Sequence, residues 1–112
     1  IWGSPVSPPY RSFGFMWDEE RRYATYQLIP DNCDIIINHS PPFGILDKVE
    51  EGQHVGCEIL AKRLSELNPQ LVVFGHIHEG YGELKRNNTI YVNASIMTRR
   101  YQATNLPICI EL

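Results

Sequence analysis

The chain has 112 residues, a net charge of −3 and 43% hydrophobic residues, which suits one folded domain or a part of one. Charged residues make up 21%, close to the globular average, and this excludes wholesale disorder. The acidic balance argues against a protein held on a nucleic acid polymer by charge, and no apolar run approaches the ~20 residues of a membrane-spanning helix. Three cysteines without a C-x-x-C pair argue against a disulfide framework and fit a reducing compartment. We therefore expect a soluble, cytoplasmic protein with no membrane or nucleic acid polymer as its partner.

The first part of the chain predicts a strand end, a proline-rich loop and one helix. Residues 1–5 are apolar and then broken by Gly and Pro, and residues 13–17 are a possible short strand. Asp18 is expected to cap a helix that runs through Leu28 and is ended by Pro30. Because the chain opens inside a strand and without methionine, we expect that the amino-terminal part of a larger protein is missing.

The rest of the chain predicts strands around one amphipathic helix. The helix covers residues 55–67, where apolar side chains recur at steps of three and four residues while Arg63 is expected on the outer face. The predicted strands are residues 34–38, 71–74, 81–85, 89–93 and 108–112. The order of strand, helix, strand and then hairpins predicts an α/β fold. The strands toward the carboxyl terminus are expected to pair antiparallel.

Other conspicuous side chains have ordinary structural interpretations. We expect His54 to face solvent at a helix start, and the pairs Arg21–Arg22 and Arg99–Arg100 to be solvated. The aromatic residues near the amino terminus are expected in the core or in a packed loop: Trp2, Tyr10, Phe13, Phe15 and Trp17.

Histidines follow two predicted buried strands directly. His39 ends the first, and His76 and His78 follow the second in a loop that also holds Gly75, Gly80 and Gly82. Ligands of open α/β sheets lie beyond the carboxyl ends of the strands, and neutral imidazole is a good ligand for Zn, Mn, Fe and Ni. His39 alone would be interpreted as a structural residue. The G-H-x-H pair favours metal binding, since a simple turn needs the glycines but not two imidazoles.

These residues resemble a known family. Asn38-His39-Ser40-Pro41-Pro42 and Gly75-His76-Ile77-His78-Glu79-Gly80-Tyr81-Gly82 resemble the last two motifs of the calcineurin-like metallophosphoesterases. The surrounding sequence, including Tyr91-Val92-Asn93-Ala94-Ser95, is most similar to the metallophosphoesterase-domain-containing brain proteins and their invertebrate and microbial relatives. The resemblance implies that residues 1–112 are the carboxyl-terminal half of a four-layer αββα sandwich with mixed sheets.

The resemblance also implies roles for individual residues. His39 and His76 would bind the second of two divalent metal ions (Mn, Fe or Zn), and His78 would bind the first. The loop from His76 through Ile77 and His78 to Glu79 would lie against the phosphate of a nucleotide or related phosphodiester. Glu51 and Gly52 are further candidates for substrate contact. Some relatives carry glycine at the position of His76 and are weak enzymes, so the histidine favours activity.

The earlier motifs of the family, D-x-H, G-D and G-N-H-D/E, do not occur in this sequence. No catalytic residue is therefore assigned within the chain, and its expected partner is the amino-terminal half of the enzyme, as a covalent or separate chain. The resemblance implies a binuclear metal phosphodiesterase acting on cyclic nucleotides or related phosphodiesters. Two alternatives remain open: an inactive nucleotide-binding or partner-docking module, and a mononuclear H-x-H metal site on a strand.

Overall fold

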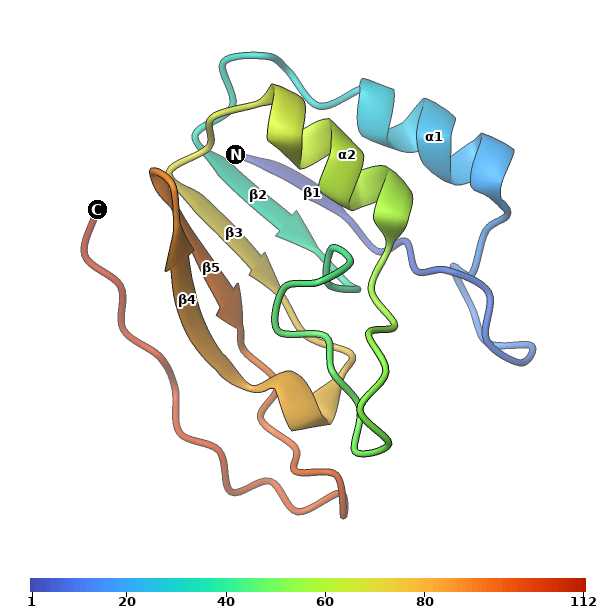
Figure 1. The fold of residues 1–112 in the computed structure, drawn as a ribbon, viewed down its shortest axis with the longest axis vertical. Helices are drawn as coiled ribbons and strands as arrows, with labels where there is room; N and C mark the ends of the chain where they lie inside the picture. Colours follow the sequence, from blue (N-terminus) through green and yellow to red (C-terminus); the bar gives the residue numbers. More distant parts are fainter.

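The computed structural model describes all residues, 1–112, and contains one mixed sheet with two helices on one of its faces (Figure 1). The sheet order is β1-β2-β3-β5-β4. Four strands run parallel and β4 pairs antiparallel with β5. The strands are β1 (Trp2–Ser4), β2 (Ile35–Asn38), β3 (Leu71–Phe74), β4 (Gly82–Arg86) and β5 (Thr89–Asn93). This is the predicted α/β class with a mixed sheet.

The hydrophobic core lies between the sheet and the helices. Ile36, Val72 and Tyr91 are aligned across three neighbouring strands and are all buried. Tyr26 from α1 (Glu19–Gln27) and Leu60 from α2 (Glu58–Glu66) pack on the same cluster. This burial supplies the main stabilisation, since removing apolar surface from water is the dominant favourable contribution to folding.

The opposite face of the sheet is less covered. Ile37, Val73 and Val92 form one row across β2, β3 and β5. Ile37 is 47% exposed although it belongs to the run of isoleucines that predicts cover on both faces. The prediction of two covered faces is therefore wrong for this part of β2 within the chain.

Helix α1 begins where its acidic residues indicate. The Asp18 carboxylate accepts a hydrogen bond from the backbone N–H of Arg21 at 2.9 Å, which satisfies a free donor of the first turn. Helix α2 starts three residues later than predicted, because Val55 and Cys57 hydrogen-bond to Asp47 and Pro41 instead of entering the helix. No helix in the described chain is long and apolar enough to cross a membrane.

Two predicted strands do not form. Residues 13–17 make only a single bridge, between Ser7 and Met16, and Phe15 lies in the left-handed region at φ +60°. Residues 108–112 lie outside any strand and run past β4 in the red carboxyl-terminal segment (Figure 1). Both segments have strand-like composition but lack a full ladder of partners, which composition alone cannot reveal.

Several side-chain predictions are also wrong. Arg22 is buried, and its guanidinium donates to the Trp17 carbonyl at 2.9 Å and to the Cys57 sulfur at 3.1 Å. Arg63 is also buried and donates to the carbonyls of Tyr26, in the last turn of α1, and of Ile29, just after the helix. Each guanidinium is hydrogen-bonded to backbone carbonyls, which explains why a charged group can lie inside. Of the five aromatic residues near the amino terminus, three are exposed: Tyr10, Phe13 and Phe15.

Candidate metal and phosphate site

His39 and His76 lie at the carboxyl ends of two neighbouring parallel strands and face each other. The Gly75 N–H donates to the His39 carbonyl at 3.0 Å, which extends the pairing of β2 with β3 by one bond. The Nε2 atom of His39 lies 3.2 Å from the Nδ1 atom of His76, with the ring centroids 4.8 Å apart. The sheet register therefore brings these two predicted ligands together.

Both imidazoles lie where burial favours the neutral form. Burial lowers the pKa of His39 below its usual value, although the residue as a whole is exposed. Burial also lowers the pKa of His76, and the nearby charges of His39 and His78 lower it further. Since only a neutral imidazole has a lone pair to offer a metal ion, these environments suit metal binding.

The loop that carries His76 depends on unusual backbone conformations. His76 itself has φ +66°, a region that a non-glycine residue occupies at a free-energy cost, and such residues cluster at functional sites. Gly80 is needed for close approach, because a Cβ atom there would lie 2.0 Å from the Leu46 carbonyl oxygen. Gly82 has φ +143°, but Gly75 does not need a positive φ. Gly80 and Gly82 thus allow the fold of the loop, while His76 has the strained backbone conformation.

His78 starts the short 3-10 helix η1 (His78–Gly80) and turns toward a different segment. Its Nδ1 atom lies 3.2 Å from the Thr98 carbonyl oxygen. Because a carbonyl can only accept, Nδ1 carries the hydrogen and Nε2 keeps a free lone pair. Metal-binding histidines commonly donate their other ring N–H in this way.

Asn93, at the carboxyl end of β5, holds two loops at the site. Its fully buried side chain donates to the carbonyls of Leu46 at 3.0 Å and Ile77 at 2.8 Å. Its oxygen accepts from the backbone N–H and the hydroxyl of Ser95. The sequence drew attention to Asn93 only through the resemblance, since a buried Asn is not visible in composition.

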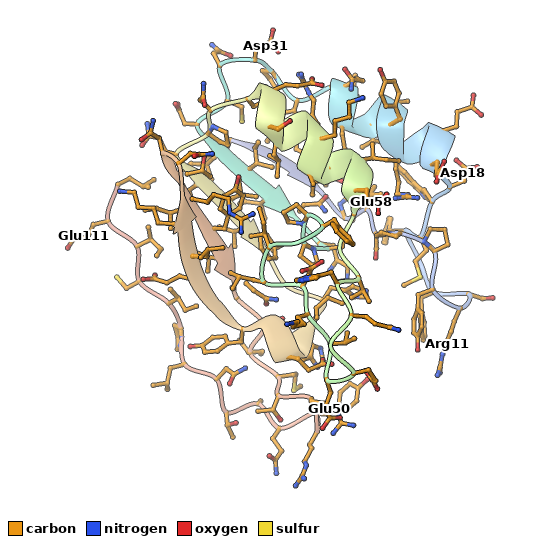
Figure 2. All side chains as sticks on the ribbon, viewed as in Figure 1. Arg11, Asp18, Asp31, Glu50, Glu58 and Glu111 are labelled. Atoms are coloured by element: carbon orange, nitrogen blue, oxygen red, sulfur yellow. The ribbon has the colours of Figure 1, made fainter.

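The remaining predicted contact residues lie on facing segments. Glu79 accepts a hydrogen bond from the Glu50 N–H at 3.2 Å, and Glu50 forms an ion pair with Arg99. Glu51 and Gly52 are exposed in the adjoining turn, in which Gly52 donates to the Val49 carbonyl at 2.9 Å. Figure 2 shows Glu50 at the tip of this loop, beyond η1. Ile77 is buried, so its side chain faces the protein.

Asp47 and His54 form a pair that the sequence analysis missed, in which the carboxylate is buried and the imidazole is exposed. The fully buried Asp47 carboxylate lies 2.6 Å from the Nδ1 atom of His54 and accepts from the N–H groups of Gly44 and Gly56. His54 is exposed, as predicted, and its ring also contacts the Asp47 carboxylate. The two partners are seven residues apart in an irregular loop, where no periodicity connects them.

The donor set of the chain fits divalent metal ions only in part. His39, His76 and His78 can each present a ring nitrogen, and imidazole suits Mn, Fe and Zn. However, no group of three or more His, Cys, Asp or Glu side chains in the structure is arranged to hold one ion. Two facing imidazoles without carboxylates are an incomplete ligand set, and a metal ion bound there would need further ligands.

Comparison with known proteins identifies the family of the chain. The model of the calcineurin-like phosphoesterase family matches residues 7–80. The human and mouse proteins named Metallophosphoesterase domain-containing protein 1 are each 45% identical to the chain over 115 aligned residues, covering 100% of it. A solved crystal structure aligns with a TM-score of 0.56 and 27% identity over 85% of the chain and 39% of its own.

The chain covers 35% of the length of the human and mouse relatives, about a third of each. The family match includes β2, β3 and the three histidines that follow these strands, but not Asn93 or Thr98. Sequence match, sheet topology and paired histidines agree: the chain belongs to the calcineurin-like phosphoesterases, a family of hydrolases that typically bind metal ions.

Proposed function

We propose that this chain, completed by an amino-terminal half, is a binuclear metal phosphodiesterase acting on cyclic nucleotides or related phosphodiesters. The observation that carries the proposal is the 3.2 Å approach of the His39 and His76 ring nitrogens at the carboxyl edge of the sheet. Two imidazoles this close together, one of them on a residue with a strained backbone, are suited to binding a cation.

The three histidines have distinct roles in this proposal. His39 and His76 would hold one ion, and His78 would bind the other through Nε2, the ring nitrogen that does not face the Thr98 carbonyl. Bound divalent metals, manganese among them, polarise phosphoryl oxygens and lower the pKa of bound water. The backbone from His76 to Glu79 then orients the phosphate, with Glu51 and Gly52 at the far side of the substrate.

The incomplete ligand set supports a second half as partner. Ile37 leaves apolar surface exposed on the face of the sheet away from the helices, and the edge of β1 that faces away from β2 has no strand partner. Exposed apolar surface and unpaired strand edges favour association with further protein. We propose that the amino-terminal half supplies the missing carboxylate ligands, and that the assembled protein works in the cytoplasm.

Activity of the assembled protein tests the proposal. The chain is co-expressed with the upstream segment, and hydrolysis of bis-p-nitrophenyl phosphate is measured with added Mn²⁺. His76→Ala and His78→Ala should each lower kcat/KM at least about 100-fold, since removing a ligand costs more than removing its hydrogen-bond partner. Lys62→Ala, an exposed substitution on α2, serves as the matched control and should leave the rate unchanged.

Unchanged turnover in both histidine variants would remove them from the mechanism. A protein that binds nucleotide but never hydrolyses it would favour the alternative, an inactive nucleotide-binding or partner-docking module. That alternative agrees with the absence of a three-ligand metal group in the described chain.

A further inference from the structure

Tyr101 is an exposed aromatic residue in direct contact with a candidate metal ligand. Its side chain is 77% exposed, and its ring meets the His78 ring at right angles, with centroids 5.3 Å apart and an interplanar angle of 82°. An exposed tyrosine on its own is ordinary. This one lies beside His78, where the phosphate of the substrate is proposed to bind.

The backbone holds Tyr101 in a conformation that tyrosine disfavours. Its φ is +59°, in the left-handed region, where glycine and asparagine are far better tolerated than bulky residues. A closed turn fixes this conformation. The backbone N–H of Tyr101 donates to the Thr98 carbonyl at 2.9 Å, and the backbone N–H of Thr98 donates to the Gln102 carbonyl at 2.9 Å. A large ring kept at a position better suited to a small residue indicates that the ring itself has a use.

The same turn is tied to the site at two points. The Thr98 carbonyl that accepts from Tyr101 also lies 3.2 Å from Nδ1 of His78. On the other side, Arg99 forms an ion pair with Glu50, whose N–H donates to Glu79. The segment after β5 runs below η1 and beside the loop between β2 and α2 (Figure 1). These contacts therefore fix the position of the Tyr101 ring relative to the site.

We propose that Tyr101 is the stacking platform for the base of a nucleotide whose phosphate lies at the loop from His76 to Glu79. The inference rests on the proposed phosphodiesterase function and names the residue that would favour nucleotides over other phosphate esters. A nucleotide carries its base one sugar away from the phosphate, so the base falls beside the metal ligands. A flat, solvent-facing aromatic ring stabilises any base by stacking, without regard to its identity.

Two ligands that differ only in the base test this role. Binding of 5′-AMP and of ribose 5-phosphate to the assembled, Mn²⁺-loaded protein is measured by calorimetry. Tyr101→Asn removes the ring but keeps a residue that tolerates a positive φ, and Tyr101→Phe keeps the ring without its hydroxyl. We expect Tyr101→Asn to weaken 5′-AMP binding about 5- to 100-fold, with ribose 5-phosphate binding unchanged and Tyr101→Phe close to the unaltered protein.

The control substitution is Tyr10→Asn, which removes an exposed tyrosine from the loop before α1 and should change neither affinity. Equal weakening of both ligands by Tyr101→Asn would assign Tyr101 a structural role and overturn the inference, while the phosphodiesterase proposal would stand if bis-p-nitrophenyl phosphate is still hydrolysed. Equal affinity of the unaltered protein for both ligands would also overturn it. Failure to bind either ligand, together with no hydrolysis, would overturn both proposals.

Discussion

The Nε2 atom of His39 and the Nδ1 atom of His76 lie 3.2 Å apart although 37 residues separate them in the chain. Parallel pairing of β2 with β3 brings the two histidines to one edge of the sheet, and the Gly75 N–H fixes their backbones together. The candidate site is thus a consequence of sheet register and not of a local motif. A shift of one residue in that register would move one histidine to the other face.

The packing of η1 against the loop between β2 and α2 can be tested at Gly80. In Gly80→Ala the new Cβ atom would lie 2.0 Å from the Leu46 carbonyl oxygen, so one of the two segments must move. We expect a loss of stability of about 2–4 kcal/mol, in the range of overpacking and backbone strain, measured by urea unfolding. Gly14→Ala is the matched control, because a Cβ atom there meets nothing within 4 Å. Equal stability of the two variants would contradict the described contact.

Asp47 is expected to stabilise the loop more than any exposed carboxylate does. Asp47→Ala leaves the N–H groups of Gly44 and Gly56 and the His54 ring without their acceptor. Unsatisfied buried donors cost about 1–3 kcal/mol each, so we expect a total loss of about 3 kcal/mol or more in the free energy of unfolding. Asp31→Ala removes a carboxylate that pairs with Arg63 but is 92% exposed, and it should cost less than about 1 kcal/mol. Similar losses in both variants would show that Asp47 is solvated in solution.

We expect the free energy of unfolding to fall at alkaline pH because of the Tyr26 hydroxyl. Burial raises the pKa of its hydroxyl well above the usual value, and the neighbouring Cys57 raises it further. Because the folded pKa exceeds the unfolded value of about 10, this contribution is complete below pH 10 and is lost as the pH rises above it. The expected slope is about 1.4 kcal/mol per pH unit above pH 10.

Tyr26→Phe isolates that contribution in urea unfolding at pH 8 and pH 11. At pH 8 the variant should be less stable by about 1 kcal/mol, since it loses the weak contact of the hydroxyl with Asn38. At pH 11 the difference should shrink or reverse, because phenylalanine cannot ionise. Tyr23→Phe removes an exposed hydroxyl from the same helix and is the control. Its free energy of unfolding should stay close to that of the unaltered protein. A constant difference for Tyr26→Phe would contradict the buried environment.

Local patterns predicted the elements that have strong local causes. Asp18 caps α1 as expected, and the hairpin of β4 and β5 forms because the turn after Arg86 includes Asn87, which tolerates its φ of +54°. The apolar runs of β2 and β3 and the histidines after them also follow from the sequence. These features depend on residues that are close in the chain.

The features that the sequence did not predict depend on partners far along the chain. The spacing of apolar residues in α2 predicts that Arg63 is exposed. It is buried instead, where its guanidinium donates to the carbonyls of Tyr26 and Ile29. Residues 108–112 have strand composition but do not pair as a strand. The Asp47–His54 pair and the Tyr101–His78 contact arise in irregular loops, where side-chain direction follows from tertiary packing and not from periodicity.

The most direct test of the central claim is the metal affinity of the assembled protein, measured by calorimetric titration with Mn²⁺. We predict that His39→Ala, His76→Ala and His78→Ala each weaken binding at least about 10-fold, because each removes a ligand. His54→Asn, which changes the fourth histidine of the chain and can keep a donor toward Asp47, should bind Mn²⁺ as the unaltered protein does. Unaltered affinity in all three alanine variants would show that these imidazoles hold no metal and would contradict the account.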